Sequence, residues 1–187
     1  MSEEESAVKL ALPLLVVALG VVPAAGALAQ HAHEHGVAEL RIALDGPTVL
    51  VEFESPLVNL LGFEHAPRSD AEKVAMAALE DTLRAPERLF ALPAAAGCSL
   101  EEVELELPGA AQHAGHDHEH DSHGHGHEDE HADAYAVWEY VCTTPPGAVE
   151  VTVIEAFPAI RVLRSEVAGP RGQTAGRIET PRGHLAL

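Results

Sequence analysis

The sequence predicts an α+β domain with a mainly antiparallel sheet, one main covering helix and a disordered His-rich loop between two strands. Segments in which apolar and polar residues alternate outnumber the segments with helical periodicity. Strands and helices do not alternate regularly along the chain, which argues against a doubly wound parallel sheet. One low-complexity stretch, at about residues 109–133, separates two predicted strands.

The first predicted strands are Val37–Leu44 and Thr48–Ser55, in which apolar and polar residues alternate. Asp45-Gly46-Pro47 lies between them and is typical of a turn, so the two strands are expected to form a hairpin. A short helical turn is expected at Leu57–Leu61, ending at Gly62.

The clearest helix is expected to begin after Ser69 and to end before Pro86. Ser69 and Glu72 have the spacing of a capping box. Apolar residues at helical spacing form a stripe that is predicted to cover a sheet face. This stripe consists of Ala71, Val74, Ala75, Ala78, Leu79, Thr82 and Leu83. Further strands are expected at Val149–Ile154, Ile160–Val167 and Arg177–Thr180.

A second hairpin is expected to carry the low-complexity stretch. Cys98–Leu107 and Tyr135–Cys142 both alternate apolar with polar residues. If these strands pair antiparallel, Cys98 lies opposite Cys142 or close to it, which predicts a disulfide in an oxidising compartment. Two thiolate metal ligands are the alternative, which is weak because the two Cys have no CxxC spacing.

The first 29 residues are expected to be a signal peptide. Leu10–Ala29 is an uncharged apolar run that ends in Ala27-Leu28-Ala29, the small-x-small pattern read by signal peptidase. An uncleaved membrane anchor is the alternative, since about 20 apolar residues can span a bilayer. Pro23 and two glycines make this run a poor spanning helix. We therefore expect residues 30–187 to form a single periplasmic domain without stable membrane insertion.

The charge of the chain favours a cation as its ligand. The 187 residues include 30 Asp or Glu, 11 Lys or Arg and 13 His, which gives a formal net charge of -19 with His neutral. A nucleic-acid-binding protein needs a basic surface, which this balance does not supply. The chain contains 2 Met, too few for a methionine-rich copper(I) site.

The low-complexity stretch, residues 109–133, is called the His-rich insert below. It contains no Leu, Ile, Val or aromatic residue from His113 to His131, so it cannot bury a core. Its imidazoles stand in His-x-His units among Asp and Glu, and neutral imidazole is a good ligand for zinc, nickel and copper(II). We expect several sites of modest affinity, because each ion must order the backbone around it. A solvated polar linker is the alternative, which the density of His disfavours. The expected ligands are His113, His116, His118, His120, His123, His125, His127 and His131.

A second candidate site lies on the ordered body. One group of His precedes the first strand, and Gly62-Phe63-Glu64-His65 follows the second strand. Residues before the first strand of a hairpin and after its second strand emerge at the same end, so the two groups are expected to meet there. Such a preorganised site binds zinc more tightly than the insert, whereas a frayed N-terminus is the alternative. The candidate ligands are His31, His33, His35, Glu39, Glu64 and His65.

These motifs together resemble the ZrgA family of periplasmic zinc-uptake accessory proteins. The specific part is His33-Glu-His35-Gly-Val-Ala-Glu39-Leu with Gly62-Phe63-Glu64-His65. The other matching features, in the expected order, are Ser55-Pro56, Cys98, the His-rich insert, Tyr135–Cys142, Phe157-Pro158 and Gly172-Gln173. The resemblance implies a periplasmic zinc-binding protein that assists an ABC-type zinc importer. It also implies that the ligand positions are His33, His35, Glu39, Glu64, His65 and the insert His.

The expected function is capture of Zn(II) and assistance of its high-affinity import, with the His-rich insert as collecting arm. The expected partners are zinc ions and a periplasmic zinc-binding protein or ABC zinc importer. The alternative is a periplasmic buffer or resistance protein for Zn, Ni or Cu(II) without a delivery role. An enzyme is not expected, because the sequence has no HExxH or GxSxG motif and His33-Glu34-His35 lacks the i, i+4 spacing.

Overall fold

Alternation of apolar and polar residues builds most of the strands in the computed structural model, which describes residues 34–109 and 132–187. The expected signal peptide, His31, His33 and all eight insert His lie outside the described residues. The strands of the larger sheet are β1 (Val37–Asp45), β2 (Thr48–Pro56), β4 (Cys98–Glu106), β5 (Asp133–Cys142), β7 (Val162–Gly169) and β8 (Gly172–Ile178). A smaller sheet contains β3 (Phe90–Ala91), β6 (Ala148–Val151) and β9 (Gly183–Ala186).

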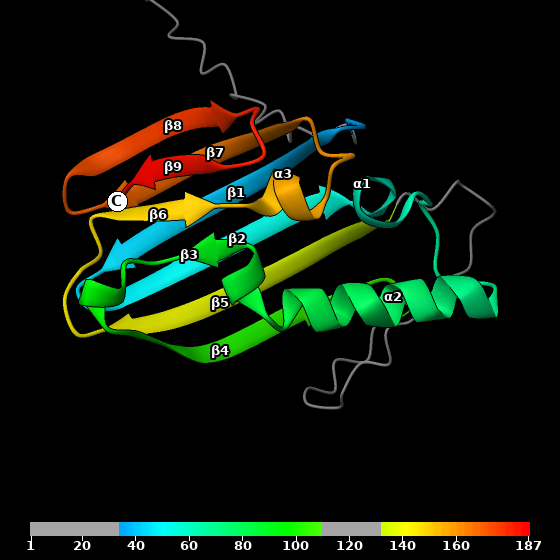
Figure 1. Ribbon diagram of the computed structural model, residues 1–187, viewed down its shortest axis with the longest axis horizontal. Coiled ribbons are helices and arrows are strands. Elements are labelled where there is room, and N and C mark those ends of the chain that lie inside the picture. The colour runs from blue at the N-terminus through cyan, green and yellow to red at the C-terminus, as the bar shows by residue number, and fades with distance from the viewer. Residues whose placement is uncertain (1–33, 110–131) are drawn as a thin grey trace, which may run out of the picture. The chain divides into compact units, whose positions relative to one another are not determined.

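The larger sheet has the strand order β4-β5-β2-β1-β7-β8, and β6 is the central strand of the smaller sheet (Figure 1). All pairs are antiparallel except β1 with β7, which run parallel. The predicted antiparallel-rich sheet is therefore confirmed, with one parallel pair that the sequence did not indicate. The hairpin of β1 and β2 pairs Glu39 with Glu54 and Asp45 with Thr48, as its turn residues predicted.

The helices are α1 (Leu57–Leu61), α2 (Asp70–Leu83) and α3 (Val153–Ala156), with 3-10 turns at Pro86–Arg88 and Ala94–Ala96. Within residues 34–109 and 132–187, none of the helices has the length and apolar character needed to span a membrane. The predicted capping box of α2 is confirmed. The Glu72 amide donates to Ser69 Oγ at 3.2 Å, and the Ser69 amide donates to Glu72 Oε2 at 2.9 Å. Hydrogen bonds from the Ser69 and Arg68 amides lower the pKa of Glu72.

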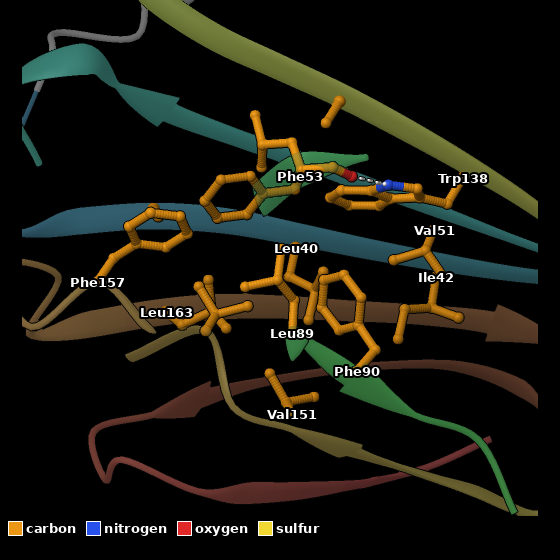
Figure 2. Packing of buried hydrophobic residues seen from close by; sticks show 14 of the residues in the cluster. Leu40, Ile42, Val51, Phe53, Leu89, Phe90, Trp138, Val151, Phe157 and Leu163 are labelled. Carbon is orange, nitrogen blue, oxygen red and sulfur yellow. Dashed lines mark hydrogen bonds between the residues drawn. The ribbon is translucent and has the colours of Figure 1, made fainter. Parts of the chain in front are cut away.

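One face of the larger sheet is covered, and the hydrophobic core lies on that face. Figure 2 shows Leu40, Ile42, Val51, Phe53 and Trp138 from the larger sheet facing Leu89, Phe90 and Val151. The Trp138 indole donates to the Leu83 carbonyl at 2.7 Å, so the end of α2 is tied to the sheet. The residues that alternate with the buried ones, such as Glu52 and Glu54, lie on the other, open face, as the period of a strand requires.

The apolar stripe predicted for α2 is partly wrong. Val74 is 71% exposed, whereas Met76, Leu79 and Leu83 are buried. The prediction counted Ala71, Ala75 and Ala78 as core residues, although an Ala side chain has little apolar area to bury. Met76 lies one turn before Leu79 and two turns before Leu83, and it completes the face that packs.

The later strands are shifted relative to the prediction. The segment predicted as strand 149–154 is β6 followed by α3, which includes Val153 and Ile154. Ile160 lies before β7, and the strand predicted at residues 177–180 ends at Ile178 as part of β8. The two-residue β3 and the four-residue β9 were not predicted, because such short strands show no alternation.

The second hairpin and its disulfide are confirmed. β4 and β5 pair antiparallel with Cys98 opposite Cys142, and their Sγ atoms lie 2.08 Å apart. The His-rich insert connects the other ends of these two strands. This puts the disulfide at one end of the hairpin and the two ends of the insert at the other.

Candidate metal centre

His35 lies in a tight turn immediately before β1. The Val37 amide donates to the Glu34 carbonyl at 3.0 Å, and Gly36, the third residue of this turn, has a φ of +81°. A positive φ at this position favours Gly. A Cβ at Gly36 would also lie 2.8 Å from Arg161 Nε, so the Arg161 side chain would have to move to admit a larger residue.

Glu64 reaches the same place from the other strand of the hairpin. β2 leads directly into α1, and α1 ends at Gly62, whose amide donates to the Val58 carbonyl at 2.9 Å with φ of +83°. The chain then reverses through Phe63, so the Glu64 carboxylate contacts the His35 imidazole. The predicted meeting of the two groups is thereby observed for His35 and Glu64. Their side chains are 64% and 27% exposed, which leaves the contact open to solvent.

His65 contacts the residues next to it in the sequence. Its Nδ1 donates to the Ala66 carbonyl at 2.9 Å, and its ring stacks on Phe63 with the centroids 5.2 Å apart. A neutral imidazole that donates through Nδ1 has its Nε2 lone pair free for a metal ion. Nε2 is therefore the nitrogen through which His65, one residue after Glu64, could bind a metal ion.

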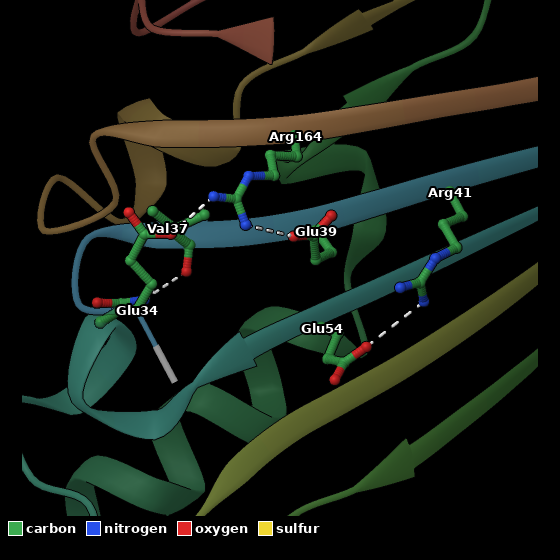
Figure 3. Close-up of polar contacts among 7 residues, drawn as sticks. Glu34, Val37, Glu39, Arg41, Glu54 and Arg164 are labelled. Carbon is green, nitrogen blue, oxygen red and sulfur yellow. Dashed lines mark hydrogen bonds and ion pairs between the residues drawn. The ribbon is translucent and has the colours of Figure 1, made fainter. Parts of the chain in front are cut away.

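Glu39, another candidate ligand, is engaged by an arginine of β7. Arg164 Nη1 donates to Glu39 at 3.2 Å, and its Nη2 donates to Glu34 at 2.6 Å (Figure 3). These hydrogen bonds, the one to Glu34 first, raise the pKa of Arg164. The structure thus joins Glu39 to Glu34 through Arg164, on the open face of the sheet.

The ends of the His-rich insert adjoin the segment that carries Glu64. The Ala132 amide donates to the Glu64 carbonyl at 3.1 Å, and the Leu57 amide donates to the Ala132 carbonyl at 2.8 Å. At the other end, a Cβ added to Gly109 would lie 3.3 Å from Ala66 Cβ. Ala132 is therefore hydrogen-bonded to residue 64, and Gly109 lies beside residues 66–67.

Two donors are too few to enclose an ion by themselves. Among residues 34–109 and 132–187, no three His, Cys, Asp or Glu side chains come together in a metal-binding group. His35 and Glu64 supply one nitrogen and one oxygen donor, and zinc prefers four ligands. A metal ion held here would take its remaining ligands from water, from His65 after a side-chain rotation, or from residues outside the described part.

Two residues beside this centre, Arg164 and Asn59, were not predicted from the sequence. Arg164 gave no signal because its two partners are 125 and 130 residues away in the sequence. Asn59 did give a weak one, since it is the polar residue in the otherwise apolar segment Leu57–Leu61. His184 is exposed on β9, opposite Glu150.

A solvent-facing His–carboxylate pair beyond the open end of the β1–β2 hairpin has the donor types of a divalent-metal-binding protein. Residues 32–187 match the model of the ZrgA family zinc uptake proteins, and the chain belongs to this family. A comparison with curated proteins gave no match. The resemblance predicted from the motifs is confirmed, and membership associates the chain with zinc uptake rather than with an enzyme family.

Proposed function

We propose that this protein captures Zn(II) in the periplasm and assists its high-affinity import. In this proposal the His-rich insert collects zinc, and the His35–Glu64 pair is the ordered point to which the ion passes. The observation that carries the proposal is the hydrogen bond between Ala132, at the end of the insert, and Glu64. Ala132 directly follows His131, the last His of the insert in the sequence, so this main-chain hydrogen bond links the end of the insert to the residue that carries the carboxylate.

The insert supplies capture capacity. Its eight imidazoles and interleaved carboxylates offer many overlapping ligand sets. The composition predicts no packed core, so each bound ion has to order the chain around it, which lowers affinity and speeds release. Weak, exchangeable sites suit a segment that collects zinc and passes it on.

The ordered pair supplies tighter binding. The backbone on both sides of His35 is fixed by the turn, and Glu64 follows a capped helical turn, so little ordering remains when zinc binds. The exposure of both side chains leaves coordination positions open to ligands of an acceptor. Open positions allow ligand exchange, by which zinc can pass to an importer or its binding protein.

Zinc uptake by a deletion strain tests the proposal. At chelator-limited zinc, the strain should accumulate less zinc than the parent, and the wild-type gene should restore uptake. Genes with His35→Ala or Glu64→Gln should restore uptake poorly, whereas His184→Ala should restore it fully as the matched control. Normal uptake combined with sensitivity to excess zinc, nickel or copper would instead support the buffering role.

A further inference from the structure

Asn59 is a buried polar residue beside the candidate metal centre. In the described part of the chain the buried polar side chains are Ser55, Asn59 and Ser165, and Asn59 is 4% exposed. It lies in α1, where its neighbours Leu57 and Leu60 pack into or against the core. Burying an amide is unfavourable unless its hydrogen bonds are made, so its contacts deserve an explanation.

The Asn59 side chain holds the backbone of the His35 turn. Its Oδ1 accepts from the Gly36 amide at 2.7 Å, and its Nδ2 donates to the Val37 carbonyl at 2.8 Å. Nδ2 also donates to Ser55 Oγ at 3.3 Å. Only a carboxamide presents a donor and an acceptor side by side in this way, so Asp and Leu of similar size each lose at least one of the two backbone contacts.

The same turn is also held by Arg161 and Val162, at the start of β7. The Gly36 carbonyl accepts from the Arg161 amide at 2.8 Å and from the Val162 amide at 3.0 Å. The amide and carbonyl of Gly36 are therefore both engaged, directly after His35. The His35 side chain is exposed, yet the main chain that carries it is fixed.

We infer that Asn59 is a positioning residue, which holds the His35 turn against α1 so that the imidazole meets the Glu64 carboxylate. Asn59 belongs to the segment that leads into Glu64, and its amide grips the segment that carries His35. It thus ties the two zinc donors together without touching the ion. The inference rests on the proposed function of the His35–Glu64 pair.

Loss of the hydrogen bonds between Asn59 and the turn is expected to weaken zinc binding rather than to unfold the protein. Residues that orient metal ligands from outside the coordination sphere change metal affinity by about 10- to 100-fold when they are mutated. We expect Asn59→Asp to fall in this range, because it keeps an acceptor for the Gly36 amide and loses the donor to Val37. Ser55→Ala is the matched control, since Ser55 is equally buried and contacts Asn59 but not the turn.

The test uses the full chain with the eight insert His changed to Ser, so that zinc titration reports the ordered site. In this background Asn59→Asp should weaken zinc binding about 10- to 100-fold, and Ser55→Ala should leave it within about 2-fold. When His35→Ala is already present, Asn59→Asp should have little further effect, because residues acting through one another are not additive. The visible spectrum of bound Co(II) should change with Asn59→Asp and not with Ser55→Ala.

A second variant that alters the same turn helps to distinguish a loss of positioning from a folding defect. Gly36→Ala leaves Asn59 in place but forces a side chain into a positive φ next to Arg161, and should show the same His35-dependent loss. Circular dichroism checks that each variant is folded. Unchanged affinity in both turn variants, or equal losses with and without His35, would overturn the positioning role. If His35→Ala alone leaves affinity unchanged, the proposed zinc pair is wrong and the inference falls with it.

Discussion

The Ala132 amide donates a hydrogen bond to the Glu64 carbonyl, with 3.1 Å between nitrogen and oxygen. Ala132 ends the stretch that contains eight His, and the Glu64 side chain contacts His35. One end of the His-rich insert is thus fastened to the main chain of a candidate zinc ligand. We expect that the proposed roles of the insert as collecting segment and of the His35–Glu64 pair as ordered site can be separated by mutation.

Changing the eight insert His to Ser should remove the weakly bound zinc ions and leave one tight ion. The strands on both sides of the insert are paired along their length, so the fold should be retained. Isothermal titration counts the ions, and circular dichroism checks the fold. Loss of the tight ion together with the weak ones would show that the insert supplies essential ligands to the ordered site.

In that background, His35→Ala or Glu64→Gln should each weaken the remaining ion more than the roughly 10- to 100-fold expected for residues outside the coordination sphere. In the proposed site, His35→Ala removes the nitrogen donor, and Glu64→Gln replaces the carboxylate with a neutral amide, which is a weaker ligand for zinc. His184→Ala serves as control, because His184 is exposed on β9 and faces Glu150 of β6. Unchanged affinity in both ligand variants would exclude the pair as the tight site.

Zinc on the insert should be released first when the pH falls from about 7 to about 5.5. Imidazole has an ordinary pKa of about 6.5 and must be neutral to bind, so a site with many His competes with many protons. A site with one His and a carboxylate competes with fewer. Titrations at three pH values should therefore show a steeper pH slope for the intact protein than for the variant with the insert His changed to Ser. Equal slopes would mean that the insert does not contribute to the functional metal.

Replacing Cys98 and Cys142 by Ser should lower the free energy of unfolding by about 4 kcal/mol. The two Cys are 44 residues apart, and their disulfide removes the corresponding loop entropy from the unfolded chain. Urea denaturation under oxidising conditions measures the difference. A reducing agent should destabilise the wild type and leave the double variant unchanged. Equal stability of the two oxidised proteins would contradict the prediction.

Alkaline pH should destabilise the protein through Tyr140. Burial, with a smaller contribution from the Glu87 charge, raises the pKa of Tyr140 to about 12. The folded state then keeps the phenol proton where the unfolded state, with pKa about 10, releases it. Stability present below pH about 10 should decrease as the pH rises toward 12, and Tyr140→Phe should reduce that decrease. The chain has 2 Tyr, so the ultraviolet titration of the variant should show Tyr135 alone. If the ultraviolet titration of Tyr140→Phe still showed the phase at about pH 12, the assignment of this pKa to Tyr140 would be wrong.

Local periodicity explains why the first hairpin and the second were predicted almost to the residue. Their strands alternate over eight or more residues, and β1 and β2 extend only one residue beyond the predicted ends. The parallel pairing of β1 with β7 has no such signal, because it depends on how a long connection crosses the sheet. The prediction of which α2 residues are buried was partly wrong for a related reason. Ala residues fit either the buried or the exposed face of a helix, and the contact with the sheet decides which face of α2 is buried.

The sequence by itself predicted the types of donor, determined the pairing of Cys98 with Cys142, and predicted that a His before the first strand meets Glu64 or His65. Each follows from residue type or from hairpin geometry, which is local. Only the tertiary structure decided that Arg164 engages Glu39 and that Asn59 grips the turn at Gly36. These contacts join segments whose distance in space is set by the packing of the whole domain, and no periodicity along the chain encodes that distance.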